Sequence, residues 1–129
     1  GTFQGESWKR IGFTRQILDA LPNPLHLCDS SWDPYTSTAG ENYYMIYLGK
    51  EIKPEWAFDL PVKNAFYPRL KEGVRFKVEV IDTWNMTIAE WPAVFETTAP
   101  VKNRVYDKIQ GRVRLPASPY LLLRITEVE

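Results

Sequence analysis

The chain has 129 residues and carries 16 basic and 16 acidic side chains, so its formal net charge is zero. This length suits a single domain with a sizeable core. The charge balance and the lack of a basic run exclude the electrostatic footprint of a nucleic-acid-binding protein. No apolar run approaches the roughly 18 residues of a membrane span, so we expect neither a nucleic acid nor a membrane as partner.

The chain has one cysteine, Cys28, and one histidine, His26. A lone cysteine forms no internal disulfide, so it leaves the compartment open. Zinc-finger sites and Cys–His nucleophile pairs cannot be built from this inventory. A Ser–His–Asp triad would need His26 as its base, but Leu25 and Leu27 flank it and no G-x-S-x-G turn occurs, which favours a structural histidine. We expect no catalytic residue and no cofactor in this chain.

Three acidic residues in one polar segment, Asp29, Asp33 and Glu41, raise the question of a calcium site. Calcium takes oxygen ligands from such segments, but the spacing matches no EF-hand loop. Turn-forming Asp and Ser side chains explain the same composition. We predict no metal site, and whether these acids bind calcium stays open at this point.

The first predicted element is a helix from about Trp8 to Ala20, with a glycine-containing loop in front of it. Ser7 is a suitable N-cap, and Pro22 and Pro24 end the helix because proline lacks an N–H and restricts the preceding residue. The apolar residues that fall near one face are Trp8, Ile11, Ile17, Leu18 and Leu21. Such a stripe must pack on a sheet or on another module.

Residues 22–42 are expected to form a linker and loop, because they hold three prolines and many Ser, Thr, Asp and Asn residues, with at most one short strand near Leu25 and Leu27. From residue 43 the pattern changes. The apolar run YYMIYLG (43–49) is typical of a core strand. The alternation in VRFKVEVID (74–82) predicts a strand with its valines on one face and its charges on the other.

Further strand patterns continue to the C-terminus. They are WAFDLP (56–61), TIAEWPAVF (87–95), GRVRLP (111–116) and PYLLLRITEV (119–128), the last expected to be buried on both faces at its start. Pro92 favours an edge or a bulge, and residues 96–110 look like a connection with a short strand or turn. The sequence therefore predicts a mainly β fold, an antiparallel β-sandwich of about six to eight strands with one N-terminal α-helix.

The segment IDTWNMTI (81–88) is expected to be a turn between two strands. Asp82, Thr83 and Asn85 have side chains that cap the exposed backbone groups of a bend. Trp84 would then lie over the end of the core.

The aromatic content suggests a second kind of site. The chain has five Trp, seven Tyr and six Phe, and flat rings in loops can stack on the apolar faces of sugars. The candidates for sugar stacking are Trp32, Tyr35, Trp56, Trp84 and Trp91. The alternative is that these rings pack in the core, as aromatic residues do in small sandwiches.

The opening segment GTFQGESWKRIGFTRQIL (1–18), with Gly5-Glu6-Ser7, Arg10-Ile11 and Phe13, resembles the end of the catalytic module in bacterial apiosidase-like glycoside hydrolases. The remainder is similar to their C-terminal β-sandwich, an uncharacterised domain that follows a (β/α)₈-type barrel. The phrases that carry this similarity are YYMIYLG, EVIDTWNMTI (79–88) and LPASPYLLLRI (115–125). The resemblance covers nearly the whole chain, although none of these phrases is catalytic.

The resemblance implies three segments: a barrel tail with loop and final helix (1–21), a linker and loop (22–42) and a C-terminal β-sandwich (43–129). The catalytic carboxylates would then lie in the barrel, so this chain alone is not an enzyme although its parent is a glycoside hydrolase. Glu6 is a candidate substrate contact in the parent, since barrel loops carry active sites; alternatively its charge favours a helix N-terminus. The expected helix anchors to the barrel or the sandwich are Trp8, Ile11 and Leu18.

The function that this implies is a non-catalytic accessory domain that packs on and stabilises the catalytic barrel. The alternatives are a carbohydrate-binding module that uses loop aromatics and a protein-interaction sandwich. The partners would be the chain's own barrel and a polysaccharide, with self-association of the isolated fragment through its uncovered helix face. The resemblance favours a secreted or periplasmic bacterial protein, and the sugar and its linkage stay open.

Overall fold

The computed structural model describes residues 2–29, 33–64 and 66–128 and is mainly β. One helix, α1 (Thr2–Asp19), precedes eleven strands in this part of the chain. The strands are β1 (His26–Asp29), β2 (Asp33–Gly40), β3 (Tyr43–Tyr47), β4 (Glu55–Ala57), β5 (Asp59–Pro61), β6 (Arg75–Asp82), β7 (Thr87–Glu90), β8 (Phe95–Glu96), β9 (Arg104–Tyr106), β10 (Arg112–Arg114) and β11 (Leu121–Glu127). Within the described ranges no helix is long and apolar enough to cross a membrane.

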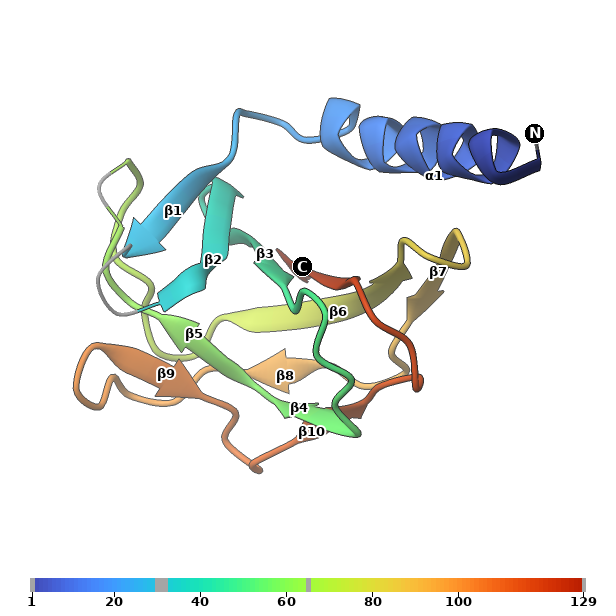
Figure 1. Ribbon diagram of the computed structural model, residues 1–129. Helices are drawn as coiled ribbons and strands as arrows, with labels where there is room; N and C mark the ends of the chain where they lie inside the picture. The colour runs from blue at the N-terminus through green and yellow to red at the C-terminus, as the bar shows by residue number, and fades with distance from the viewer. Residues whose placement is uncertain (1, 30–32, 65, 129) are drawn as a thin grey trace.

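Seven strands form one antiparallel sheet in the order β1-β2-β3-β11-β6-β7, with β8 also paired to β6. The remaining strands form two small antiparallel pairs, β4 with β10 and β5 with β9. Figure 1 shows these pairs on one side of the main sheet and α1 on the other. The predicted mainly β, antiparallel sandwich with one helix is confirmed, with more strands than expected because several have only two or three residues.

The core lies between the main sheet and the two small pairs. Phe58 is at its centre, where its ring is 5.1 Å from Phe95, 5.9 Å from Phe76 and 5.6 Å from Trp56 between centroids. The alternation predicted for residues 74–82 is confirmed, because Phe76, Val78 and Val80 of β6 are buried in this core. Burying large aromatic and aliphatic side chains is the main favourable term in folding.

Strand β11 lies in the middle of the sheet, between β3 and β6. Leu121 and Leu123 on its core face are fully buried, whereas Leu122 on the other face is only partly buried, so the predicted burial of both faces holds in part. On the opposite face Arg124 pairs with Glu79 of β6, its Nε and one Nη each 2.9 Å from a carboxylate oxygen. The hydrogen bonds from Arg124 lower the pKa of Glu79 despite the opposing effect of partial burial.

Two predicted strands divide in the structure, one of them at a proline. The run 87–95 splits at Pro92 into β7, which ends the main sheet, and β8, which pairs with the other end of β6. This confirms the expected edge, since proline cannot donate to a ladder. The run 56–61 likewise divides into β4 and β5 on either side of Phe58.

Helix α1 corrects two expectations. It begins at Thr2, so residues 2–6 are helical where a loop was predicted, and Ser7 lies inside the helix. The segment contains no proline to prevent an earlier start, and Gly5 costs only about 1 kcal/mol in a helix. Among the side chains described from Trp8 to Asp19, the buried one is Ile17, which packs on Met45 and Ile81.

The predicted anchors Trp8, Ile11 and Leu18 are 74%, 54% and 45% exposed, so they do not hold α1 to the sandwich. The residues that face the sheet are one helical turn apart, Phe13, Ile17 and Leu21. The reason is geometric: the apolar stripe is wider than the contact, and only side chains at i, i+4 and i+8 lie over the sheet.

The expected linker over 22–42 is also wrong in part, because β1 and β2 form there and join the main sheet. Thr36 and Thr38 are buried, so the strand has a polar inner face that sequence composition alone presents as a loop. The hydroxyl of Thr38 is satisfied by carbonyl groups, 2.8 Å from Gly40 O and 3.0 Å from Tyr43 O. A hydrogen-bonded threonine can be buried at little cost.

Candidate functional site

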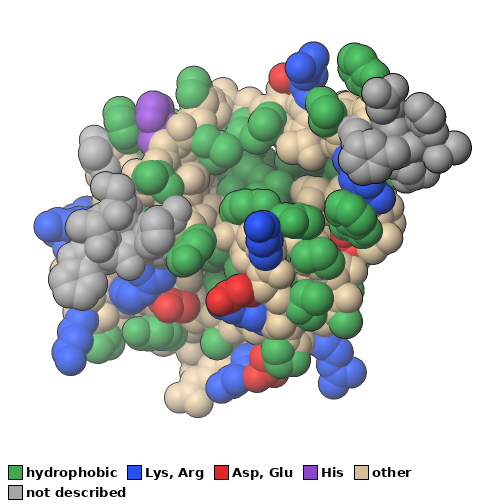
Figure 2. All heavy atoms as spheres, in the orientation of Figure 1, with side chains coloured by type: hydrophobic (Ala, Val, Ile, Leu, Met, Phe, Trp, Pro, Cys, Tyr) green, Lys and Arg blue, Asp and Glu red, His purple; other side chains and the backbone are tan. Residues whose placement is uncertain are grey.

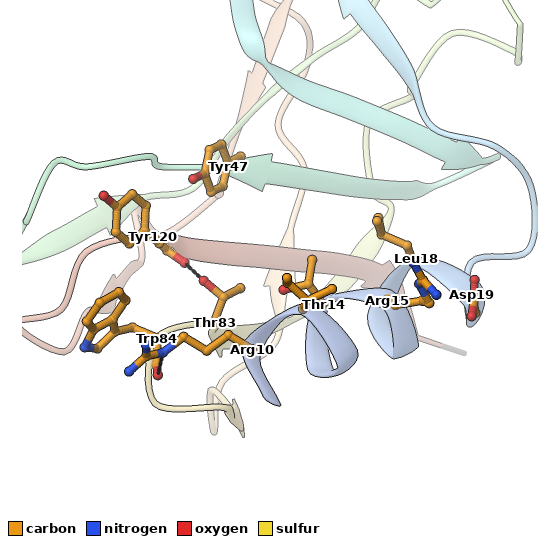
Figure 3. A pocket seen from close by; sticks show the side chains of 10 residues that line it. Arg10, Thr14, Arg15, Leu18, Asp19, Tyr47, Thr83, Trp84 and Tyr120 are labelled. Atoms are coloured by element: carbon orange, nitrogen blue, oxygen red, sulfur yellow. Dashed lines mark hydrogen bonds between the residues drawn. The ribbon is translucent and has the colours of Figure 1, made fainter. Parts of the chain in front are cut away.

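A groove of about 590 Å³ runs between α1 and one end of the main sheet. Figure 3 shows Arg10, Arg15 and Asp19 on its helix side. Its other side is formed by Tyr47 at the end of β3 and Tyr120 just before β11. Figure 2 shows a hollow on this face with hydrophobic side chains in its floor. The groove thus combines apolar rings with charged groups, the usual composition of a ligand site.

The turn between β6 and β7 carries the third ring of the groove, Trp84. The Asp82 carboxylate accepts hydrogen bonds from the backbone N–H groups of Trp84 (3.0 Å) and Asn85 (2.9 Å) and from the Asn85 side chain (2.8 Å). Burial acts to raise the pKa of Asp82, but these hydrogen bonds outweigh it and lower the pKa overall. The backbone capping predicted for Asp82 is confirmed, whereas the Asn85 side chain bonds to the side chains of Asp82 and Ser118 rather than to the backbone.

Trp84 is also the contact that joins the turn to the helix. The Arg10 guanidinium lies 3.7 Å from the centre of the Trp84 ring, and Arg10 Nε donates a hydrogen bond of 3.0 Å to Trp84 O. Cation–π contacts of this kind hold an arginine over one ring face. The helix end of the groove is therefore fixed by Arg10 as well as by Ile17.

Tyr120 has an unusual backbone. Its φ is 59°, in the left-handed region that bulky residues avoid. Both of its backbone groups are held: its N–H donates to Gly49 O (2.6 Å), and its carbonyl accepts from Thr83 Oγ1 (2.6 Å). The surrounding structure thus imposes this conformation and places the Tyr120 ring 6.1 Å from the Trp84 ring.

A smaller groove of about 170 Å³ lies next to the first, and Tyr47 lines both. Tyr35 and Trp56 also line it, together with an ion pair in which Arg104 Nε is 2.5 Å from Asp59 Oδ1. Tyr35 is 61% exposed and Tyr47 is 45% exposed. Exposed rings on two neighbouring strands are thereby brought together in one surface.

The candidates for sugar stacking have different positions. Tyr35 and Trp56 share the smaller groove, Trp84 is in the larger one, and Trp91 packs against the core. Trp56 also packs against the core with part of its ring. Trp32 and the side chain of Glu6 lie outside the described residues.

Sequence analysis missed two rings, Tyr47 and Tyr120, because it searched loops for platforms. A signal was available for Tyr47. In YYMIYLG the alternation places Tyr44 and Ile46 in the core and Tyr43, Met45 and Tyr47 on the helix side of the sheet. For Tyr120 the sequence held no comparable signal, since its position depends on a left-handed backbone.

The histidine and the acidic residues have structural surroundings. The His26 ring stacks on Phe66 with centroids 4.0 Å apart. The buried Asp107 carboxylate accepts hydrogen bonds from the N–H groups of Glu96 (2.9 Å) and Gly111 (2.7 Å). In the described ranges, no three His, Cys, Asp or Glu side chains gather as a metal would require. The Asp29 and Asp33 side chains of the calcium hypothesis lie outside the described residues.

The fold and these surfaces define a small antiparallel β-sandwich domain with an attached helix and an aromatic groove. The chain belongs to the family described as "Domain of unknown function (DUF5605)", which matches residues 32–126. It is similar to a crystallised protein described as a putative glycoside hydrolase from Bacteroides vulgatus ATCC 8482, with 53% sequence identity and a TM-score of 0.92. That match covers 95% of this chain and 24% of the crystallised chain. No curated protein matches the sequence.

Proposed function

We propose that this chain is a non-catalytic accessory domain of a larger glycoside hydrolase and that it packs on the catalytic domain through the outer face of α1. The observation that carries the proposal is the match at 53% identity to a putative glycoside hydrolase of which this chain spans only 24%. The remaining three quarters of such a protein offers room for a catalytic domain. In keeping with the sequence resemblance, we propose an apiosidase-like parent whose last barrel helix is α1.

The acidic side chains support a non-catalytic role. Glycoside cleavage needs a pair of carboxyl groups, and the general acid of that pair has a raised pKa. Among the described carboxyl groups, those whose pKa is shifted are Glu79, Asp82 and Glu96, and each is lowered. These groups and Asp107 are engaged in hydrogen bonds within the fold.

The exposed face of α1 supports the packing role. Trp8, Ile11 and Leu18 are three large apolar side chains that are largely exposed, and Ile11 and Leu18 also line the groove between α1 and the sheet. Contiguous exposed apolar surface is typical of a contact with another module. We therefore assign residues 1–21 to the contact with the catalytic domain and begin the sandwich at β1, earlier than the sequence suggested.

The packing proposal is tested in the full-length hydrolase. The substitution of Trp8 and Ile11 by serine should lower the melting temperature of the catalytic domain, because the contact between the modules is lost. The matched control is Ile109→Ser, since Ile109 is 84% exposed and lies on the connection between β9 and β10, far from α1. Equal melting temperatures for the Trp8/Ile11 variant and the native protein would refute the packing role.

The isolated 129-residue chain gives two further tests. It should release no reducing sugar from any polysaccharide, and hydrolysis by it would contradict the non-catalytic role. Its uncovered α1 face should also cause concentration-dependent self-association, measurable by sedimentation velocity, which Trp8→Glu should suppress. In the full-length enzyme, unchanged activity of a Glu6→Gln variant would dispose of Glu6 as a substrate contact.

A further inference from the structure

Four aromatic side chains lie on consecutive strands at one end of the main sheet. Tyr35 is in β2, Tyr47 ends β3, Tyr120 precedes β11 and Trp84 follows β6, and these strands are neighbours in the order β2-β3-β11-β6. We propose that this aromatic row, Tyr35–Tyr47–Tyr120–Trp84, binds an extended neutral polysaccharide chain. The row itself contains no residue of α1, although Ile11 and Leu18 line the groove beside it, so the test below changes only residues of the sandwich.

Strand register places Tyr35 and Tyr47 side by side and Tyr120 further toward the same end of the sheet. Thr36 is opposite Ile46, so the next residues outward, Tyr35 and Tyr47, follow one another across β2 and β3. Tyr47 is opposite Leu122, and Tyr120 lies two residues before Leu122 in the chain. Neighbouring strands are about 4.8 Å apart, so a row across four strands extends on the order of 15 Å, the length of a short run of sugar rings.

Three of the rings are largely exposed, and Trp84 and Tyr120 are held in place by contacts within the fold, which favours stacking on a sugar. Tyr35, Tyr47 and Trp84 are each between 45% and 61% exposed. Arg10 lies over Trp84, and the two backbone hydrogen bonds of Tyr120 hold that residue in its left-handed conformation. Backbone strain that the surroundings maintain is frequent at ligand sites. Figure 3 shows Tyr47, Tyr120 and Trp84 along the same side of the groove.

The polar groups of the groove select a neutral ligand. Of the three charged residues that line the groove, Arg10 is already bonded to Trp84, and the other two, Arg15 and Asp19, have opposite charges. This pair favours neither an acidic nor a basic polymer, and both side chains can hydrogen-bond to hydroxyl groups, as can the hydroxyls of Thr14 and Thr83. Figure 2 shows this hollow open at the surface of the molecule, so an extended chain can reach it.

The test is affinity electrophoresis of the isolated 129-residue chain in gels containing xyloglucan, galactomannan, mixed-linkage β-glucan or, as the anionic comparison, polygalacturonate. At least one neutral polysaccharide should retard the native chain and change its Trp fluorescence. Tyr47→Ala should weaken the affinity about tenfold, the loss of one ring contact with its buried area. Tyr120→Gly should do the same without loss of folding, because glycine accepts the left-handed backbone.

The matched control is Tyr106→Ala, which removes a tyrosine of similar exposure, 41%, from β9 outside the aromatic row. It should bind as the native chain does. The proposal is overturned if no neutral polysaccharide retards the chain, if only polygalacturonate does, or if Tyr47→Ala and Tyr120→Gly bind like Tyr106→Ala. Circular dichroism and thermal unfolding of each variant show whether weaker binding comes from the missing ring or from a loss of folding.

Discussion

The Arg10 guanidinium lies over the Trp84 ring at 3.7 Å and also donates a hydrogen bond to the carbonyl of the same residue. One side chain of α1 is thus bonded to both the ring and the backbone of the β6–β7 turn, 74 residues further along the chain. Because the apolar contacts of this segment with the sheet lie at Phe13, Ile17 and Leu21, Arg10 adds a contact nearer the start of α1.

Arg10→Ala should therefore loosen α1 while leaving the sandwich intact. An exposed cation–π contact contributes about 0.5–1 kcal/mol and a hydrogen bond about 1 kcal/mol, so amide exchange in α1 should accelerate by roughly tenfold. Hydrogen–deuterium exchange measured by mass spectrometry resolves the helix from the strands. Arg15→Ala is the control on the same helix, and equal exchange in the two variants would show that the Trp84 contact does not hold α1.

Glu79 of β6 and Arg124 of β11 form an ion pair across two neighbouring strands. We expect Glu79→Gln to lower the free energy of unfolding by about 2 kcal/mol, because the partly buried guanidinium loses its charged partner. The effect depends on pH. The pKa of Glu79 is lowered in the folded state, so its contribution is complete above the ordinary carboxyl range and is lost as the pH falls through the lowered value. Urea unfolding at several pH values should show the gap between native and variant closing in acid. A gap that widens in acid would contradict this assignment.

The Asp82 carboxylate closes the β6–β7 turn, and Asp82→Ala leaves two backbone N–H groups and the Asn85 amide without their acceptor. We expect a loss of about 1–3 kcal/mol in the free energy of unfolding. Asp82→Asn keeps one acceptor oxygen and should lose less. Because the turn carries Trp84, the intrinsic fluorescence of the Ala variant should change as well. If Ala and Asn variants are equally stable, the hydrogen bonds do not determine the turn.

Gly111 lies where no side chain fits. A Cβ at this position would be 2.6 Å from Phe95 Cε1 and 2.7 Å from Asp107 Oδ2. Gly111→Ala should therefore cost about 1–3 kcal/mol by overpacking the core. Gly12→Ala is the opposite case, since nothing lies within 4 Å of its Cβ position and the residue is inside α1. It should stabilise the helix by about 0.5–1 kcal/mol, and chemical denaturation of both variants tests the pair.

The order of apolar and polar residues within one segment was enough to predict the strands in which buried and exposed side chains alternate, and those in which apolar residues follow one another without interruption. In β6 the order of charged and apolar residues alone places Phe76, Val78 and Val80 in the core, because a strand directs successive side chains to opposite faces. In the β6–β7 turn, Asp82 identified the bend because its carboxylate accepts hydrogen bonds from the nearby backbone N–H groups of Trp84 and Asn85. Both are properties of neighbours in sequence.

The sequence by itself thus determined the fold class, the edge at Pro92 and the turn that carries Trp84. Only the tertiary structure decided that Ile17, rather than Trp8, Ile11 or Leu18, is buried, because the choice among residues of one apolar stripe depends on where the sheet lies. It also decided that Thr36 and Thr38 belong to a buried strand and that Tyr47 and Tyr120 line one groove. These features rest on pairings between distant segments, and the contact that forms is the one that buries the most surface while satisfying each backbone group.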